Sequence, residues 1–208
     1  MWNASLNDFR SERIEPYRGR QRLPVDSSLA VLALRTPPIQ SMNNNMQLRM
    51  VELRSEISGK LYLHSMPGRN ETLDAFLMQA SKNEIDLVVC LAADEELSRL
   101  SPDYALCVKE DTFPFERKSF VIEDFGVPSN LESFIDFAAD LAQGILAGQS
   151  VLVHCAAGIG RTGLVAASVL MQLGYPIQEA ISVISEAGSS PEIGEQGEFL
   201  LAVDTCRR

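Results

Sequence analysis

One stretch of the chain brings a cysteine, an arginine and several glycines together where a strand is expected to turn into a helix. It reads Val-Leu-Val-His-Cys-Ala-Ala-Gly-Ile-Gly-Arg-Thr-Gly over residues 151–163. A glycine-rich turn before a helix directs backbone N–H groups at one point and forms an anion site. Cys155 at the start of this turn is expected to have a lowered pKa and to be nucleophilic at neutral pH. Arg161 offers a planar fork for two phosphate oxygens, and Thr162 can donate its hydroxyl to Cys155.

The glycines of this stretch also match the dinucleotide-binding pattern G-x-G-x-x-G at Gly158, Gly160 and Gly163. That pattern belongs to the first strand–helix turn of a long doubly wound domain. Here it lies near the end of the chain, and the residues after it are predicted to be helical. The stretch also lacks the Gly-Lys-Ser/Thr of nucleoside triphosphate loops. A nicotinamide-dependent oxidoreductase is therefore disfavoured.

The residues His154-Cys155-x5-Arg161-Thr162 resemble the signature of the cysteine-dependent protein tyrosine phosphatases. The chain is most similar to the compact dual-specificity and the archaeal- or bacterial-type members, over about residues 57–205. The resemblance implies an α/β fold with a central, mostly parallel sheet flanked by helices. It also implies catalysis without a metal or other cofactor, and a His154 that points away from the substrate and hydrogen-bonds the loop. The implied phosphate-binding loop consists of Ala156, Ala157, Gly158, Ile159, Gly160 and Arg161.

The resemblance also requires a general acid on a separate loop, roughly thirty residues before the cysteine. The segment Glu-Asp-Phe-Gly-Val-Pro-Ser at residues 123–129 lies at this distance, between a predicted strand and a predicted helix. A carboxylic acid there can protonate the leaving oxygen, and its carboxylate can then activate water. We favour Asp124 as this acid and keep Glu123 as the competitor. A simple helix-capping role for Asp124 is the alternative.

Other residues carry weaker signals. Gln196 resembles a residue that positions the attacking water in some relatives, although a solvated glutamine at a helix start is an equal alternative. Arg69 could meet the substrate or simply lie on the surface. The acidic run 94–96 is explained by helix polarity alone. Cys90 and Cys107 are candidates for a resolving thiol, should peroxide oxidise the nucleophile reversibly.

The variable positions of the loop carry no basic side chain, and this bears on the choice of substrate. Ala156, Ala157 and Ile159 are neutral, and the chain has 28 acidic and 18 basic residues, a net charge of −10. Both features favour a monophosphorylated substrate, so we expect hydrolysis of phosphotyrosine, with phosphoserine and phosphothreonine as further substrates, through a cysteinyl-phosphate. A small-molecule or inositol phosphate substrate is one alternative. A phosphate-binding module without turnover is another.

Composition excludes several other classes of protein. The negative charge argues against binding to nucleic acid by bulk charge. Two histidines are too few for a His-rich metal centre, and the four cysteines form no CxxC pair. The start of the chain does not resemble a signal peptide, and no apolar run is long enough to span a membrane. These features predict a cytoplasmic enzyme whose partner is a phosphorylated protein or a small phosphomonoester.

The chain divides into a predicted N-terminal extension, residues 1–54, which is expected to pack on the core, and a predicted phosphatase domain, residues 55–208. The extension contains a basic segment at 1–22 and one possible strand at 29–34. In the domain, apolar runs predict strands and 3.6-residue periodicity predicts helices. The predicted strands are 60–64, 86–91, 120–122 and 151–154, and the predicted helices are 72–82, 93–100, 128–146, 161–173, 176–187 and 194–203.

Overall fold

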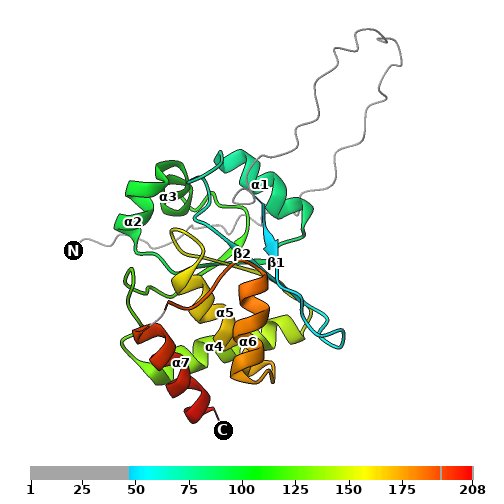
Figure 1. The fold of residues 1–208 in the computed structure, drawn as a ribbon. Coiled ribbons are helices and arrows are strands. Elements are labelled where there is room, and N and C mark those ends of the chain that lie inside the picture. The colour runs from blue at the N-terminus through cyan, green and yellow to red at the C-terminus, as the bar shows by residue number, and fades with distance from the viewer. Residues whose placement is uncertain (1–46, 193, 208) are drawn as a thin grey trace, which may run out of the picture. The chain divides into compact units, whose positions relative to one another are not determined.

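A computed structural model describes residues 47–192 and 194–207, which form a five-stranded sheet with helices on both faces (Figure 1). The strands are β1 (Arg49–Met50), β2 (Lys60–His64), β3 (Leu87–Cys90), β4 (Glu116–Ser119) and β5 (Ser150–His154). They lie in the order β1-β2-β5-β3-β4, and β2, β5, β3 and β4 run parallel, while β1 pairs antiparallel with β2. The predicted α/β fold with a mostly parallel sheet is confirmed.

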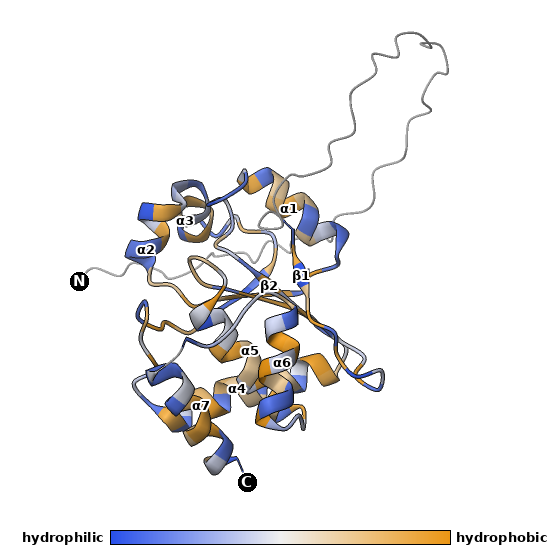
Figure 2. Ribbon diagram, in the orientation of Figure 1, coloured by the Kyte–Doolittle hydropathy of each residue, from blue (hydrophilic) through white to orange (hydrophobic). Residues whose placement is uncertain are grey.

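The helices divide between the two faces of this sheet. They are α1 (Leu73–Lys82), α2 (Asp94–Leu100), α3 (Pro102–Lys109), α4 (Leu131–Leu146), α5 (Gly160–Gln172), α6 (Ile177–Glu186) and α7 (Glu195–Cys206). Helices α1, α2 and α3 lie on one face, and α4 to α7 lie on the other (Figure 1). Figure 2 shows hydrophobic residues along the strands and hydrophilic stretches on the outer helices.

The core follows the two-residue period of the strands. In β2, Leu61 and Leu63 pack against the α4–α7 layer, whereas Tyr62 packs with Phe76 of α1 on the other face. Helix α5 is buried along nearly its whole length. Because α5 begins immediately after the cysteine-containing loop, the first turn of this helix is anchored in the core.

Two elements differ from the prediction. Helix α2 ends at Leu100, as predicted, but Pro102 then opens the unpredicted helix α3, because the first position of a helix needs no N–H donor. The sequence predicts a strand at 120–122, but the strand found there, β4, covers residues 116–119, whose polar composition suits an edge strand. The N–H groups of Phe120 and Ile122 continue the pairing by donating to the carbonyls of Cys90 and Leu91 at 3.0 Å each.

Strand β1 lies within the segment that the sequence assigned to the N-terminal extension. Arg49 and Met50 pair with Leu63 and Tyr62 of β2, so residues 49–50 are part of the sheet. The basic segment at 1–22 and the possible strand at 29–34 lie outside the described residues. No helix in the described part of the chain has both the length and the apolar composition needed to cross a membrane.

His154 ends β5 and is completely buried against Tyr104 of α3. Its Nδ1 lies 3.2 Å from the carbonyl oxygen of Cys155, which can only accept a hydrogen bond, so Nδ1 carries the hydrogen. The neutral ring then accepts at Nε2 from the Tyr104 hydroxyl, 3.1 Å away. Burial lowers the pKa of His154 to about 4, which keeps the ring neutral at pH 7.

Replacing His154 with Asn is expected to weaken the pH dependence of stability. The unfolded chain, with a histidine pKa near 6.5, binds a proton that the folded state excludes until about pH 4, so stability falls as the pH drops through this window. Each pH unit corresponds to about 1.4 kcal/mol for one proton. Urea unfolding at pH 6.5 and pH 5.0 measures the free energy of unfolding. Between these two pH values it should fall by about 1–2 kcal/mol more in wild type than in His154→Asn. Equal losses would contradict a buried, neutral His154.

Candidate active site

Cys155 lies at the point where β5 leaves the sheet, at the base of a pocket of about 410 Å³. Its side chain is buried, and the N–H of Gly158 donates to its Sγ at 3.2 Å. The pocket is also lined by the loop residues Ala156, Ala157, Ile159 and Gly160. The loop predicted from the sequence therefore surrounds the thiol and leads into α5.

The carbonyl groups of this loop are hydrogen-bonded from outside the pocket. The Cys155 carbonyl accepts from the His154 ring, and the Ala156 carbonyl accepts from the Met66 amide. The Gly158 carbonyl accepts from the Arg49 guanidinium and from the Ser189 hydroxyl. The Ser189 hydroxyl also reaches the Ile159 carbonyl. In a trans peptide the N–H of the next residue points opposite to the carbonyl, and no peptide here is cis. The N–H groups of residues 156, 157, 159 and 160 therefore point away from these donors, as an anion site requires.

Two glycines permit the close packing of this loop. Gly158 has φ +73°, a left-handed conformation that favours glycine, and a Cβ there would lie 2.3 Å from the carbonyl oxygen of His64. A Cβ on Gly163 would lie 2.4 Å from the backbone of Ser190. The glycine pattern that also matched a dinucleotide motif is thus explained by packing.

Arg161 is 2% exposed, and protein acceptors surround its guanidinium. Nη1 and Nη2 donate to the two carboxylate oxygens of Glu96 at 2.8 Å each, and Nη1 also donates to the Ile122 carbonyl at 3.1 Å. Nη2 forms an ion pair with Asp124 Oδ1 at 2.8 Å. Burial disfavours the charge of Arg161, but Glu96, Cys155 and Asp124 outweigh it, so the pKa of Arg161 lies above its usual value. The hydrogen bond from Arg161 lowers the pKa of Glu96.

The two candidate acids are placed differently. Asp124 lines the pocket and contacts Arg161, whereas Glu123 is not among the residues that line the pocket. The Asp124 side chain is 60% exposed, so it is open to solvent on one side. Next to it, Phe125 also lines the pocket and is 72% exposed, with φ 62°. An exposed aromatic ring therefore lies beside the thiol pocket.

Two further predicted residues are buried beside the loop. Gln196 accepts from the Glu192 N–H at 2.9 Å and donates to the Gly126 carbonyl at 3.0 Å, so it is not a solvated glutamine. It connects the start of α7 to the loop that carries Asp124. Within the described residues the Thr162 hydroxyl is buried and has no hydrogen-bond partner. The bond from Thr162 to Cys155 expected from the sequence is therefore not formed in this structure.

Four further charged residues line the pocket: Arg69, Glu96, Arg99 and Glu192. The sequence leaves Arg69 open between a substrate contact and a surface position, explains Glu96 by helix polarity, and gives no signal for Arg99 or Glu192. A topological signal points to Glu96. It follows β3, which neighbours β5 in a parallel sheet, and the carboxyl ends of such strands meet at one edge.

All four cysteines of the chain are free. Cys90 packs with Leu97 and Tyr104, whereas Cys155 belongs to the cluster on the other face of the sheet. Burial raises the pKa of the Cys90 thiol, which keeps it protonated at neutral pH. Within the described ranges, no group of three or more His, Cys, Asp or Glu side chains is arranged to hold a metal ion.

Comparisons with solved structures support the fold. Kinase-associated phosphatase, with its catalytic-site cysteine substituted by serine, is 20% identical with a TM-score of 0.62, covering 74% of this chain and 92% of that one. The active form of Tk-PTP is 27% identical with a TM-score of 0.57, and the match covers 74% of this chain and 99% of that one. PTPMT1 in complex with PI(5)P is 22% identical with a TM-score of 0.50, covering 71% and 94%. A search of the curated proteins gave no match.

A family model matches residues 64–175, more than half of the chain. Its description is "Tc-R-P: Polymorphic toxin system, DSP-PTPase phosphatase". The matched range contains the loop from Cys155 to Arg161 and the acidic segment at 123–124. The chain therefore belongs to this family of DSP-PTPase phosphatases, within the cysteine-dependent protein tyrosine phosphatase superfamily.

Proposed function

We propose that the chain hydrolyses phosphotyrosine, and also phosphoserine and phosphothreonine, through a cysteinyl-phosphate and without a metal ion. One observation carries the proposal: the Cys155 thiol, the Arg161 fork and the Asp124 carboxylate line the same pocket. An exposed aromatic side chain, Phe125, lines that pocket too and offers a face to an aryl ring. The family description further suggests that the enzyme acts within a polymorphic toxin system.

In the first step, phosphate oxygens bind to the loop N–H groups and to Arg161. The Cys155 thiolate attacks phosphorus in line, so an S–P bond forms while the bond from phosphorus to the leaving oxygen breaks. Asp124 in its acid form donates its proton to that oxygen. The phosphoryl group stays on Cys155, and the dephosphorylated product leaves as a neutral phenol or alcohol.

In the second step, water attacks the cysteinyl-phosphate and the S–P bond breaks. Asp124, now a carboxylate, takes the proton from water, and the thiolate of Cys155 is restored with inorganic phosphate as the product. Gln196 is a positioning residue in this proposal, because it hydrogen-bonds the Gly126 carbonyl and so supports the loop that carries the acid.

The positive field in this mechanism comes from the protein. The phosphate carries two negative charges, and charge moves to the leaving oxygen in the transition state. Backbone N–H groups held in advance by the outer hydrogen bonds, together with Arg161, can stabilise that charge without reorganisation. This is the physical reason for proposing catalysis without Mg²⁺.

Wild-type protein should hydrolyse an aryl phosphate in excess EDTA, and Cys155→Ser should lose at least about a thousandfold in kcat, because the nucleophile is gone. Trapping of a phosphorylated enzyme by acid quench should succeed only with wild type. Equal rates in the two proteins would contradict a cysteinyl-phosphate. Binding without turnover by folded wild type would favour the phosphate-binding module.

Asp124→Asn should reduce kcat by about 10²- to 10⁴-fold, since general acid catalysis contributes that much. Glu123→Gln is the matched control, because it removes a carboxylate of the same loop that does not line the pocket. Its kcat should change less than threefold. The measurement is steady-state hydrolysis of a phosphotyrosine peptide, whose leaving group needs protonation. A larger loss in Glu123→Gln than in Asp124→Asn would assign the acid role to Glu123.

Two further cations favour a substrate with a second negative group. Arg69 and Arg99 line the pocket, are exposed, and form no ion pair within the described part of the chain. Each contributes a positive field at Glu96, so both lie close to the phosphate site. An acidic residue beside phosphotyrosine would meet these charges. A second phosphate would meet them too, and the PTPMT1 neighbour in complex with PI(5)P makes an inositol phosphate the second candidate.

The double variant Arg69→Gln/Arg99→Gln should lower kcat/KM for a phosphotyrosine peptide with flanking acidic residues by about three- to tenfold, because exposed ion pairs contribute at most about 1 kcal/mol each. A neutral peptide should change less than twofold. Lys82→Gln, which removes an exposed charge outside the pocket, is the control. A soluble inositol phosphate measured in parallel decides between the candidates, because a higher kcat/KM for it than for either peptide would replace the protein substrate.

A further inference from the structure

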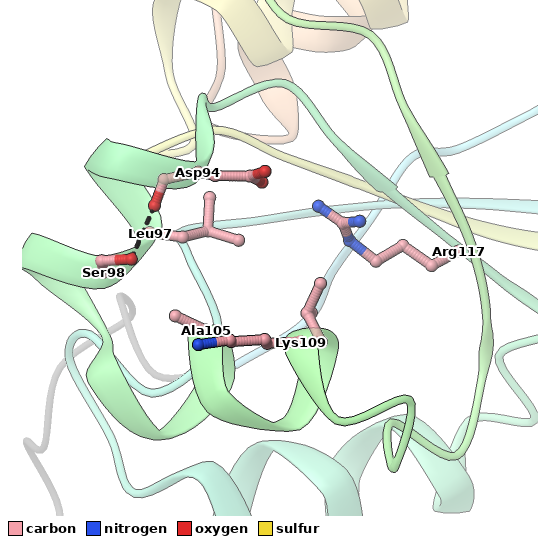
Figure 3. A pocket seen from close by; sticks show the side chains of 7 residues that line it. Asp94, Leu97, Ser98, Ala105, Lys109 and Arg117 are labelled. Atoms are coloured by element: carbon pink, nitrogen blue, oxygen red, sulfur yellow. Dashed lines mark hydrogen bonds between the residues drawn. The ribbon is translucent and has the colours of Figure 1, made fainter.

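A second pocket, of about 300 Å³, lies between α2, α3 and β4. Figure 3 shows that its walls come from these three elements and that Arg117 of β4 extends its guanidinium into the space toward Asp94 and Leu97 of α2. Ala105, Val108 and Lys109 of α3 form the remaining wall. None of these residues lines the pocket of Cys155.

Arg117 is a half-buried cation without a charged partner. It forms no ion pair among the described residues, and its Nε and Nη2 are buried without a hydrogen-bond partner. The groups beside it are the Cys90 thiol and the Tyr104 hydroxyl, which interact with the guanidinium through side-chain hydrogen bonds. Burial raises the pKa of both groups, so both are neutral at pH 7 and neither supplies a counter-charge. A partly buried cation without a counter-charge is costly unless an anion binds it.

Arg117 faces this pocket by the register of its strand. It pairs with Val88 of β3, and the next residue, Lys118, forms an ion pair with Asp140 of α4 at 2.6 Å. Adjacent strand residues point to opposite faces of the sheet. Lys118 therefore has its partner on the α4 face, whereas Arg117 has only the pocket on the α3 face.

We propose that this pocket binds a small carboxylate monoanion with a short aliphatic body. The carboxylate would accept from the part of the Arg117 guanidinium that lines the pocket, a planar donor that suits it in geometry. Arg117 and Lys109 with Asp94 leave one net positive charge in the wall, which matches one negative charge better than two. Leu97, Ala105 and Val108 offer the aliphatic part an apolar wall. The site is independent of the proposed hydrolysis.

The test uses the full chain, with the active site saturated by orthovanadate and ionic strength held constant. Sodium butyrate is titrated while amide shifts are followed by NMR. Wild type should give saturable shifts around Val108 and Arg117, and Arg117→Gln should weaken binding at least tenfold. Lys118→Gln is the matched control, since it removes a charge from the adjacent position of β4, and its affinity should stay within twofold.

Two further measurements test the proposal without the Arg117→Gln variant, in case that variant folds poorly. Lys109→Gln, at an exposed position, should weaken butyrate binding about threefold. Affinity should rise from acetate to propionate to butyrate by about two- to fourfold for each methylene that enters the apolar wall. Absence of saturable binding by folded wild type, equal weakening in Arg117→Gln and Lys118→Gln, or loss of butyrate binding on adding vanadate would each overturn the proposal.

Discussion

The buried guanidinium of Arg161 is the group on which the geometry of the active site depends. A cation that is 2% exposed needs compensation, and the two-oxygen contact with Glu96 supplies it. That contact ties α2 to the first turn of α5, and the bond from Arg161 to the Ile122 carbonyl ties in the segment that leads to Asp124. One side chain therefore fixes the relative positions of three segments that are distant in the sequence. Removing Glu96 would leave the buried charge with only the exposed, single-oxygen contact of Asp124, and for that reason the role of Glu96 is structural as well as electrostatic.

The loop around Cys155 is held by contacts made on its outer side. Arg49 from β1 hydrogen-bonds the carbonyls of Gly158 and Gly188, and Ser189 bonds two carbonyls of the loop from the segment after α6. These donors come from both ends of the described chain. These outer hydrogen bonds orient the inner N–H groups of the loop, because the C=O and the N–H of one planar trans peptide point in opposite directions. The inner N–H groups of the loop are thus positioned by residues that do not line the pocket.

Local pattern sufficed for most of the fold but for only part of the site. The apolar runs of β2, β3 and β5 and the periodicity of α1 and α4 are local signals, and the structure confirms them. The loop of Cys155 is also contiguous in the sequence, so its residue types and spacing can be recognised without knowledge of the fold. Helix α3 was missed because Pro102 reads equally as a stop and a start. Glu96 and Arg99 were missed because their place in the pocket depends on strand order, which no local pattern contains.

The two carboxylates on Arg161 differ in how firmly they are held, and this difference bears on the reaction. Glu96 is 14% exposed and contacts the guanidinium with both oxygens, whereas Asp124 is 60% exposed and uses one. An exposed single contact contributes little free energy, while the more buried double contact resists separation. In the proposed mechanism, an incoming phosphate competes with Asp124 for Nη2 and leaves Glu96 in place. If the proposed mechanism holds, substrate binding itself releases Asp124 from Arg161, beside the bond that it must protonate. Arg161 then exchanges the Asp124 carboxylate for a phosphate oxygen and keeps its contact with Glu96.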